Sequence, residues 1–196
     1  MGTLPPHQGG SAIVGYQLLS GFARAGHLVR ALAPVTPETE RQGKAFDASY
    51  PEINIRRFLM PHFELPPHFP YSDRYVHLEQ KTVQKQLTRL MGEDRTDVVL
   101  IGRETYARYV PDLANIHGIP CILIIHGGLT HGIMDGTHDP EFIDYLLSQY
   151  RKADLVVTPS RHMAANLERL GIAVTVISNC VNMKLFSPAR KGNRLR

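Results

Sequence analysis

The stretch between residues 155 and 177 constrains the fold most, because it reads as a strand, a helix and a second strand in direct succession. Residues 155–157 form a short apolar run rich in β-branched side chains, which is typical of a strand buried on both faces. Ser160 can cap a following helix that Gly171 would end. Because residues 174–177 supply a second strand, the stretch predicts a βαβ unit.

Strands and helices alternate along the rest of the chain as well. Residues 97–101 and 121–125 are the clearest buried strands, and residues 28–33 and 53–57 indicate two more, the latter at an exposed edge. Three helices with one apolar face are expected between them. The first, which ends at Gly26, has the inward residues Ile13, Tyr16, Leu19 and Phe22; the second starts at Ser72 or Asp73 and has Val76, Val83, Leu87 and Leu90; the third follows Asp139-Pro140 and has Phe142, Leu146 and Tyr150. The sequence therefore predicts an α/β fold with a Rossmann-like, mostly parallel sheet and helices on both faces.

Length and cysteine content favour one domain in a reducing compartment. A chain of 196 residues can bury a full core, since domains commonly have about 100–200 residues. Its two cysteines, Cys121 and Cys180, lie in different expected elements and give no disulfide or metal framework. No apolar run approaches the ~20 residues of a membrane-spanning helix, and no signal peptide is visible. We therefore expect a cytoplasmic protein.

The net charge of +4 does not indicate a nucleic-acid partner. The last residues carry all of this excess, in Arg190, Lys191, Arg194 and Arg196. The part before them is neutral overall, and no aromatic residues alternate with basic ones as in surfaces that stack bases. A row of cations on the expected long helix is interpreted as a solvated face, with contact to the inner face of a membrane as the alternative; the row is Lys81, Lys85 and Arg89.

The final third of the chain resembles the end of the first domain in family-4 glycosyltransferases, which are two-domain enzymes with the fold called GT-B. Residues 153–160 match the family's A-D-x-V-x-x-x-S step, and residues 177–188 match I-P-N-G-V-D-x-x-x-F-x-P. The second match departs from the family at three positions, where Ser178 replaces Pro, Cys180 replaces Gly and Asn182 replaces Asp.

This resemblance implies the N-terminal, acceptor-side half of a retaining glycosyltransferase of the hexosyltransferase type. The domain would span residues 1–188, and residues 189–196 would begin an interdomain linker or tail. A sugar would move from a nucleotide-sugar donor to a sugar or lipid-linked acceptor, without a metal or other cofactor. In the family most donor contacts and an E-x7-E carboxylate pair belong to a second domain. We therefore expect this half to be inactive until that donor domain joins it in cis or in trans.

The sequence also fits two other functions. The chain could be a non-catalytic, acceptor-binding subunit of a split two-chain glycosyltransferase, or half of a sugar-nucleotide epimerase, which shares the fold. An open reading frame that continues past Arg196 would favour a longer enzyme, and a stop codon beside a donor-domain gene would favour a split one.

The loop before the first helix is the first candidate site. Gly9 and Gly10 would let backbone N–H groups approach an anion at the helix N-terminus, and the resemblance implies contacts with the donor diphosphate or the acceptor. A flexible turn is the plain alternative. In the family a complete strand precedes this loop, whereas only residues 1–4 precede it here. The first strand would thus be largely missing, so either the start is clipped or assigned late, or the sheet has a gap between its second and fourth strands.

His126 and Gly127, directly after the expected strand at residues 121–125, form the second candidate site. The resemblance implies that His126 positions the reacting sugar hydroxyls, while Gly127 lets the sugar approach closely. A histidine that only caps the strand end is the alternative. Nearby His131 and His138 have spacings that fit no zinc or calcium motif, so we interpret them as part of a polar, mobile rim.

A third candidate site follows the strand at residues 97–101. Arg103 and Glu104 could bind acceptor hydroxyls or phosphate, and a surface ion pair is the simpler explanation.

Overall fold

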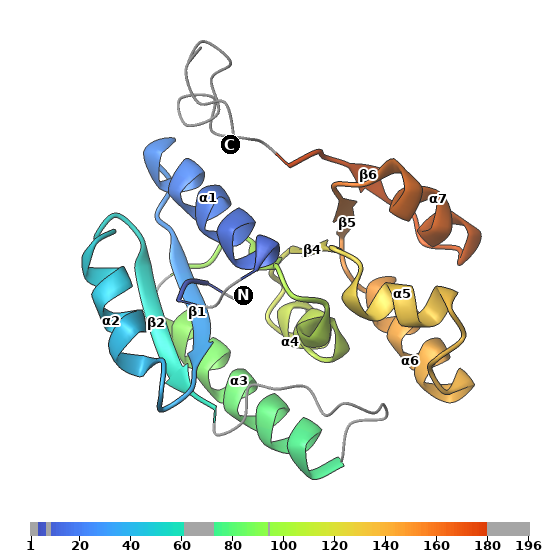
Figure 1. Ribbon diagram of the computed structural model, residues 1–196, viewed down its shortest axis with the longest axis horizontal. Helices are drawn as coiled ribbons and strands as arrows, with labels where there is room; N and C mark the ends of the chain where they lie inside the picture. Colours follow the sequence, from blue (N-terminus) through green and yellow to red (C-terminus); the bar gives the residue numbers. More distant parts are fainter. Residues whose placement is uncertain (1–3, 7–8, 61–72, 94, 180–196) are drawn as a thin grey trace, which may run out of the picture.

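The computed structural model describes residues 4–6, 9–60, 73–93 and 95–179, and the side chains of residues 73–78 lie outside this description. Strands and helices alternate through it, as the sequence predicts (Figure 1). In chain order they are α1 (Gly10–Arg24), β1 (Arg30–Val35), α2 (Glu40–Ala48), β2 (Asn54–Leu59), α3 (Asp73–Glu93), β3 (Val99–Ile101), the 3-10 helix η1 (Glu104–Arg108), α4 (Val110–Ile116), β4 (Cys121–Ile124), α5 (Gly128–Met134), α6 (Pro140–Tyr150), β5 (Leu155–Thr158), α7 (Arg161–Arg169) and β6 (Thr175–Val176).

The strands form two parallel sheets rather than one. β1 pairs with β2, and the other four described strands pair in the order β3-β4-β5-β6. The prediction of a mostly parallel sheet is therefore confirmed. Within the described residues no ladder joins β1 to β3, which agrees with a gap in the sheet, one of the two alternatives that the sequence leaves open. The interruption falls where a strand leading into α1 would lie if the sheet were continuous.

α1 and α3 cover the two faces of β1, with α1 on one side and α3 on the other (Figure 1). One core cluster runs from Leu32 of β1 through Val83 and Leu87 of α3 to Val99 and Ile101 of β3. Since α3 packs against both sheets, it holds them together despite the gap. Burial of each of these side chains contributes about 1.5–3 kcal/mol relative to exposure.

A second, smaller cluster lies between β1 and α1. It contains Leu4, Ala31, Ala33 and Ile53, and side chains of α1 pack against it, among them Tyr16. Leu4 is only 3% exposed. Leu4 is therefore anchored to the same face of β1 as α1 itself.

The predicted apolar stripe of α1 is wrong at its first residue, because Ile13 is 54% exposed. Each residue adds about 100° around a helix, so positions spaced strictly by three drift by about 60° per step. Ile13 and Phe22 therefore point in nearly opposite directions. Ala12 is the buried residue at the start of the helix.

The other predicted helices have their expected inward residues, apart from Val76, whose side chain lies outside the description. Val83, Leu87 and Leu90 of α3 are buried, as are Leu146 and Tyr150 of α6, while Phe142 is partly buried. Lys81, Lys85 and Arg89 are exposed, as predicted.

The predicted Ser160 cap is confirmed, and Asp139 caps α6 in the same way. The Ser160 hydroxyl accepts a hydrogen bond from Met163 N (3.2 Å), and the Asp139 carboxylate accepts one from Glu141 N (3.0 Å). Such caps contribute about 1 kcal/mol each. Among the described helices, none is long and apolar enough to span a membrane.

Candidate active site

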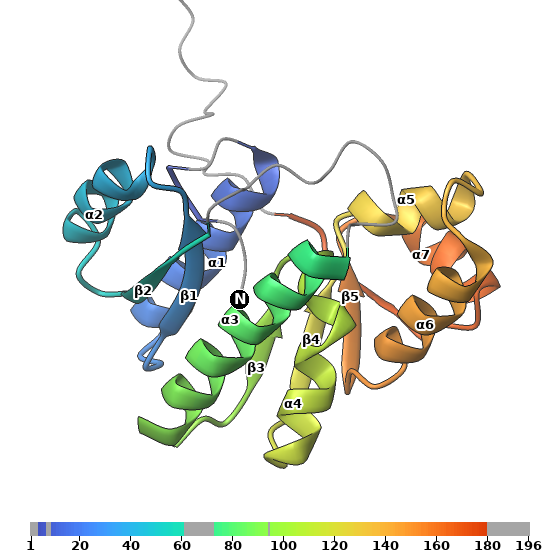
Figure 2. The same cartoon turned by 90° about the horizontal axis from the view of Figure 1, so that it is seen from below.

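The sequence-predicted loops gather at one edge of the molecule. In parallel α/β sheets, ligands bind at the carboxyl ends of strands, where the following loops meet. Figure 2 shows the amino end of α1 and the whole of α5 along the same upper edge. Gly9 and Gly10 begin α1, and His126 and Gly127 lead from β4 into α5.

His126 lies just beyond the carboxyl end of β4 and is half-buried. Burial lowers the pKa of its imidazole below the usual value of 6.5, and the Glu104 carboxylate opposes this shift. The ring is therefore mainly neutral near neutral pH, with one nitrogen that donates and one that accepts hydrogen bonds.

Glu104 holds the turn that carries His126. Glu104 is 5% exposed, and its carboxylate faces the N-terminus of α5. One oxygen, Oε1, accepts hydrogen bonds from the backbone N–H groups of Gly127 and Gly128 (2.9 Å to Gly128). The other, Oε2, accepts from the N–H groups of Leu129 (2.9 Å) and Thr130 (3.0 Å) and from the Thr130 hydroxyl (3.2 Å).

This geometry makes Glu104 a cap for α5 that comes from a different part of the chain. A carboxylate is well suited to the N-terminal amides of a helix, which have no partners within the helix. The alternative of a surface ion pair is wrong, because the side chain is buried and its oxygens contact backbone amides. The structure thus brings Glu104, Gly127 and His126 together in one unit.

Gly127 cannot be replaced without strain. Its φ of 114° lies in the left-handed region that favours glycine. A Cβ atom here would lie 2.7 Å from His131 Nε2 and 3.0 Å from Met163 Cε. The glycine is therefore required by the fold of the turn itself, whatever contact it makes with a ligand.

A buried ion pair that sequence reasoning missed lies beside Arg103. Arg108 Nη2 is 2.7 Å from Glu79 Oε2, and both side chains are buried. Burial raises the pKa of Glu79, while the guanidinium groups of Arg108 and Arg103 act in the opposite direction. Arg103 itself is half-exposed, with its guanidinium carbon 5.5 Å from the centre of the Tyr106 ring.

The sequence did contain a signal for this pair. Glu79 lies four residues before Val83 on α3, so it occupies an inward position of that helix. A carboxylate on an apolar face is expected to have a buried cationic partner.

Gly9 and Gly10 are both exposed at the start of α1. Gly9 has a φ of 144°, and its carbonyl oxygen accepts hydrogen bonds from Ala12 N (3.2 Å) and Ile13 N (3.3 Å). Pro5 is held by Arg57, whose Nη2 donates to Pro5 O (2.7 Å). These glycines share the edge of the molecule with His126 but belong to a separate element.

The two histidines predicted to form a mobile rim differ from one another. His131 is exposed, whereas His138 is half-buried, with its Nε2 3.0 Å from Leu129 O and its ring against Phe142. The prediction is therefore wrong for His138, which braces α5 against α6. Among the described residues, no group of three or more His, Cys, Asp or Glu side chains could hold a metal ion.

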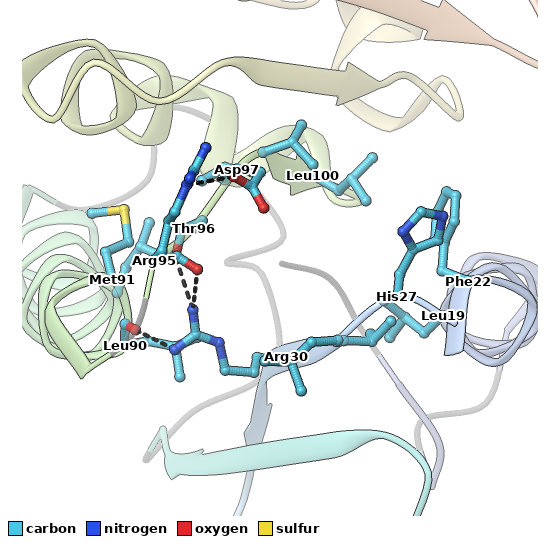
Figure 3. A pocket seen from close by; sticks show the side chains of 15 residues that line it. Leu19, Phe22, His27, Arg30, Leu90, Met91, Arg95, Thr96, Asp97 and Leu100 are labelled. Carbon is cyan, nitrogen blue, oxygen red and sulfur yellow. Dashed lines mark hydrogen bonds and ion pairs between the residues drawn. The ribbon is translucent and has the colours of Figure 1, made fainter. Parts of the chain in front are cut away.

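Two of the cavities formed by the described residues lie at the amino ends of strands. The first, of about 350 Å³ (Figure 3), includes Arg30 of β1 and Val99 of β3, and the second, of about 370 Å³, includes Leu155 of β5. Neither contains His126. We place the candidate site at the carboxyl ends of the strands, because the candidate polar residues and the N-termini of α1 and α5 lie at that edge, whereas these cavities do not.

Solved glycosyltransferase structures share the fold at low sequence identity. UGT89C1 of Arabidopsis thaliana in complex with UDP is 12% identical, with a TM-score of 0.57 over 88% of this chain and 47% of that one. UGT73P12 of Glycyrrhiza uralensis in complex with glycyrrhetinic acid 3-O-monoglucuronide is 14% identical, with a TM-score of 0.53 over 86% of this chain and 46% of that one. The present chain therefore spans less than half the length of either protein, and the likeness confirms the predicted GT-B type of fold.

No curated protein sequence matches the chain significantly. The sequence pattern described as Glycosyltransferase Family 4 matches residues 8–185, a stretch that includes every candidate site residue. On this evidence the chain belongs to glycosyltransferase family 4.

Proposed function

We propose that residues 1–188 form the N-terminal, acceptor-side domain of a retaining glycosyltransferase that moves a hexosyl group from a nucleotide sugar to a sugar or lipid-linked acceptor. The observation that carries this proposal is the position of His126 in a family-4 chain. Its neutral imidazole follows β4 at the edge where ligands of parallel sheets bind, on a turn fixed by a buried carboxylate.

Each candidate residue has a role that its geometry allows. His126 would hydrogen-bond a hydroxyl of the reacting sugar, and rigid support of such a group is what transition-state stabilisation requires. Glu104 would hold the turn that carries His126 in place, since its carboxylate oxygens already accept hydrogen bonds from backbone N–H groups of this turn. Arg103 would contact acceptor hydroxyls or phosphate, and Gly9 and Gly10 would let the donor diphosphate approach α1.

The remaining catalytic groups would come from a donor-binding domain in cis or in trans. UGT89C1 is known in complexes with UDP and with UDP-L-rhamnose, which supports a nucleotide-sugar donor for this fold. We propose a cytoplasmic location, with contact to the inner membrane face through the exposed row Lys81, Lys85 and Arg89 when the acceptor is lipid-linked.

A pair of substitutions tests the role of His126. The chain is fused after Pro188 to the second domain of a family-4 enzyme, and sugar transfer from UDP-glucose and GDP-mannose is measured together with the melting temperature. The variant His126→Ala should lose about tenfold to a thousandfold in rate, because one positioned hydrogen bond to the transition state is removed. Its melting temperature should change little, since substitutions of partly exposed side chains usually cost within about 0.5 kcal/mol.

The matched control is His117→Ala, which removes an exposed imidazole from the end of α4. It should leave both the rate and the melting temperature unchanged. An unfolded His126→Ala variant, or a stable one with the unaltered rate, would remove His126 from the site.

A further inference from the structure

A buried hydroxyl lies behind the carboxylate that holds the turn of His126. Tyr150 is the last residue of α6 and is fully buried in the main core cluster. Its phenol oxygen is 3.4 Å from Glu104 Oε2 and 3.3 Å from Thr130 Oγ1. Glu104 and Thr130 are buried as well, so the three side chains form a polar group enclosed by the core.

The hydrogen bonds between these three side chains have one consistent direction. Glu104 is the final acceptor, since backbone N–H groups already donate to both of its oxygens. The Thr130 hydroxyl donates its proton to Oε2 (3.2 Å), and its lone pairs are then open to the phenol proton of Tyr150. Tyr150 therefore donates either to Thr130 or directly to the carboxylate, and such chains of buried hydrogen bonds strengthen one another.

The phenol of Tyr150 remains a donor because it stays protonated. Burial raises the pKa of Tyr150 well above the usual value of 10.0, and the negative charge of Glu104 adds to this effect. A phenylalanine would fill the same space in the core without the cost of burying a hydroxyl. The hydroxyl of Tyr150 thus has a use other than packing.

The bonds of Tyr150 end at the carboxylate that spans the turn. Oε2 of Glu104 accepts hydrogen bonds from the first turn of α5, while Oε1 accepts one from Gly127 N, directly after His126. A carboxylate is rigid and planar, so any rotation that displaces Oε2 also displaces Oε1. The orientation that Tyr150 gives to Glu104 is therefore passed on to the backbone that carries His126.

We propose that Tyr150 is a positioning residue for His126 and acts through Thr130 and Glu104. Because it is fully buried, it reaches neither the sugar nor the nucleotide and is not a catalytic residue. Its hydroxyl keeps the carboxylate in the one orientation that serves both oxygens. The effect on sugar transfer rests on the proposed function of His126, whereas the link from Tyr150 to the turn is a property of the chain alone.

Amide exchange in the chain alone tests this link. The substitution Tyr150→Phe removes the hydroxyl and leaves the ring in the core. Exchange at Gly127 should become at least about tenfold faster, beyond any change at Ile125, whose N–H donates to Val157 O (2.8 Å) and serves as the reference for opening of the sheet. The matched control is Tyr109→Phe, because Tyr109 is also buried but its hydroxyl has no hydrogen-bond partner among the described residues. This control should leave exchange at Gly127 unchanged.

Sugar transfer by the fusion to a family-4 second domain tests the consequence for the site. Tyr150→Phe should lower kcat about tenfold with little change in KM, because a misplaced imidazole weakens contacts to the transition state more than substrate binding. Thr130→Val breaks the same chain of hydrogen bonds and should act in the same direction. Thr130→Ser keeps the hydroxyl and should recover most of the rate, and Tyr109→Phe should not lower it.

The proposal is overturned if exchange at Gly127 is unchanged in Tyr150→Phe, or if it accelerates only as much as exchange at Ile125. It is also overturned if Tyr150→Phe keeps the full kcat while His126→Ala loses rate. If His126→Ala keeps the full rate as well, the proposed function is what fails, and the exchange measurement alone decides on the link. Should Tyr150→Phe not fold, Thr130→Val decides by the same two measurements.

Discussion

The substitution Glu104→Gln tests the structural basis of the candidate site directly. The carboxylate of Glu104 accepts hydrogen bonds from four backbone N–H groups, two on each oxygen. The donors are Gly127, Gly128, Leu129 and Thr130. A glutamine side chain has the same shape, but its NH₂ group would face two of these donors instead of accepting from them. At least one buried N–H then loses its acceptor, and the charge that strengthened the other bonds is gone.

The expected cost follows from these contacts. An unsatisfied buried donor costs about 1–3 kcal/mol, and hydrogen bonds to a charged group contribute about 1.5–3 kcal/mol. We therefore expect Glu104→Gln to lower the free energy of unfolding by about 2–3 kcal/mol, which is a fall of roughly 4–12 °C in melting temperature for a chain of this size. Glu104→Ala should cost more, because all four amides lose their partner.

The assay combines thermal unfolding with amide exchange at Leu129 and Thr130. Exchange there should accelerate in Glu104→Gln by more than global destabilisation explains, because the start of α5 frays locally. The matched control is Glu168→Gln, which makes the same chemical change on the exposed face of α7 and should stay within about 0.5 kcal/mol of the unsubstituted chain. A Glu104→Gln variant as stable as this control would refute the capping role.

The pKa of the His126 imidazole should lie below 6.5 in an NMR titration, because burial disfavours its charged form. The stability that the buried, neutral His126 ring contributes should be complete above pH 6.5, and it should be lost as the pH falls through the lowered pKa. A measured pKa above 6.5 would contradict this. Burial, with the Asp154 carboxylate nearby, raises the pKa of the Cys121 thiol to about 12, so a maleimide reagent should leave Cys121 unmodified in the folded chain and modify it after denaturation. Gly127→Ala should destabilise the chain by more than Gly136→Ala, since both glycines have positive φ but only Gly127 lacks room for a Cβ; equal changes in melting temperature would show that the close contact is not limiting.

Much of the fold could be predicted because its signals are local. The strand at β5, the Ser160 cap and the helix α7 follow from neighbouring residues, and all three lie where the sequence places them.

The errors arise where a residue's environment depends on distant parts of the chain. The sequence predicts a strand from residue 28, but Leu28 is 78% exposed and β1 begins at Arg30, because pairing with β2 sets the register. The sequence favours a surface ion pair for Glu104, since nothing near it in sequence shows that its carboxylate reaches the start of α5. Contacts of this kind, between residues more than twenty positions apart, produce no periodic pattern in the sequence from which they could be predicted.

We propose that this chain is the acceptor-side half of a sugar-transferring enzyme. The most direct test measures product formation by mass spectrometry, with a panel of nucleotide sugars and acceptors, for the chain alone and for the chain fused after Pro188 to a family-4 second domain. We expect a glycosylated product from the fusion and none from the chain alone, because the donor contacts would come from the second domain. Transfer by the chain alone, or a folded fusion that binds the nucleotide sugar but glycosylates nothing in the panel, would contradict it.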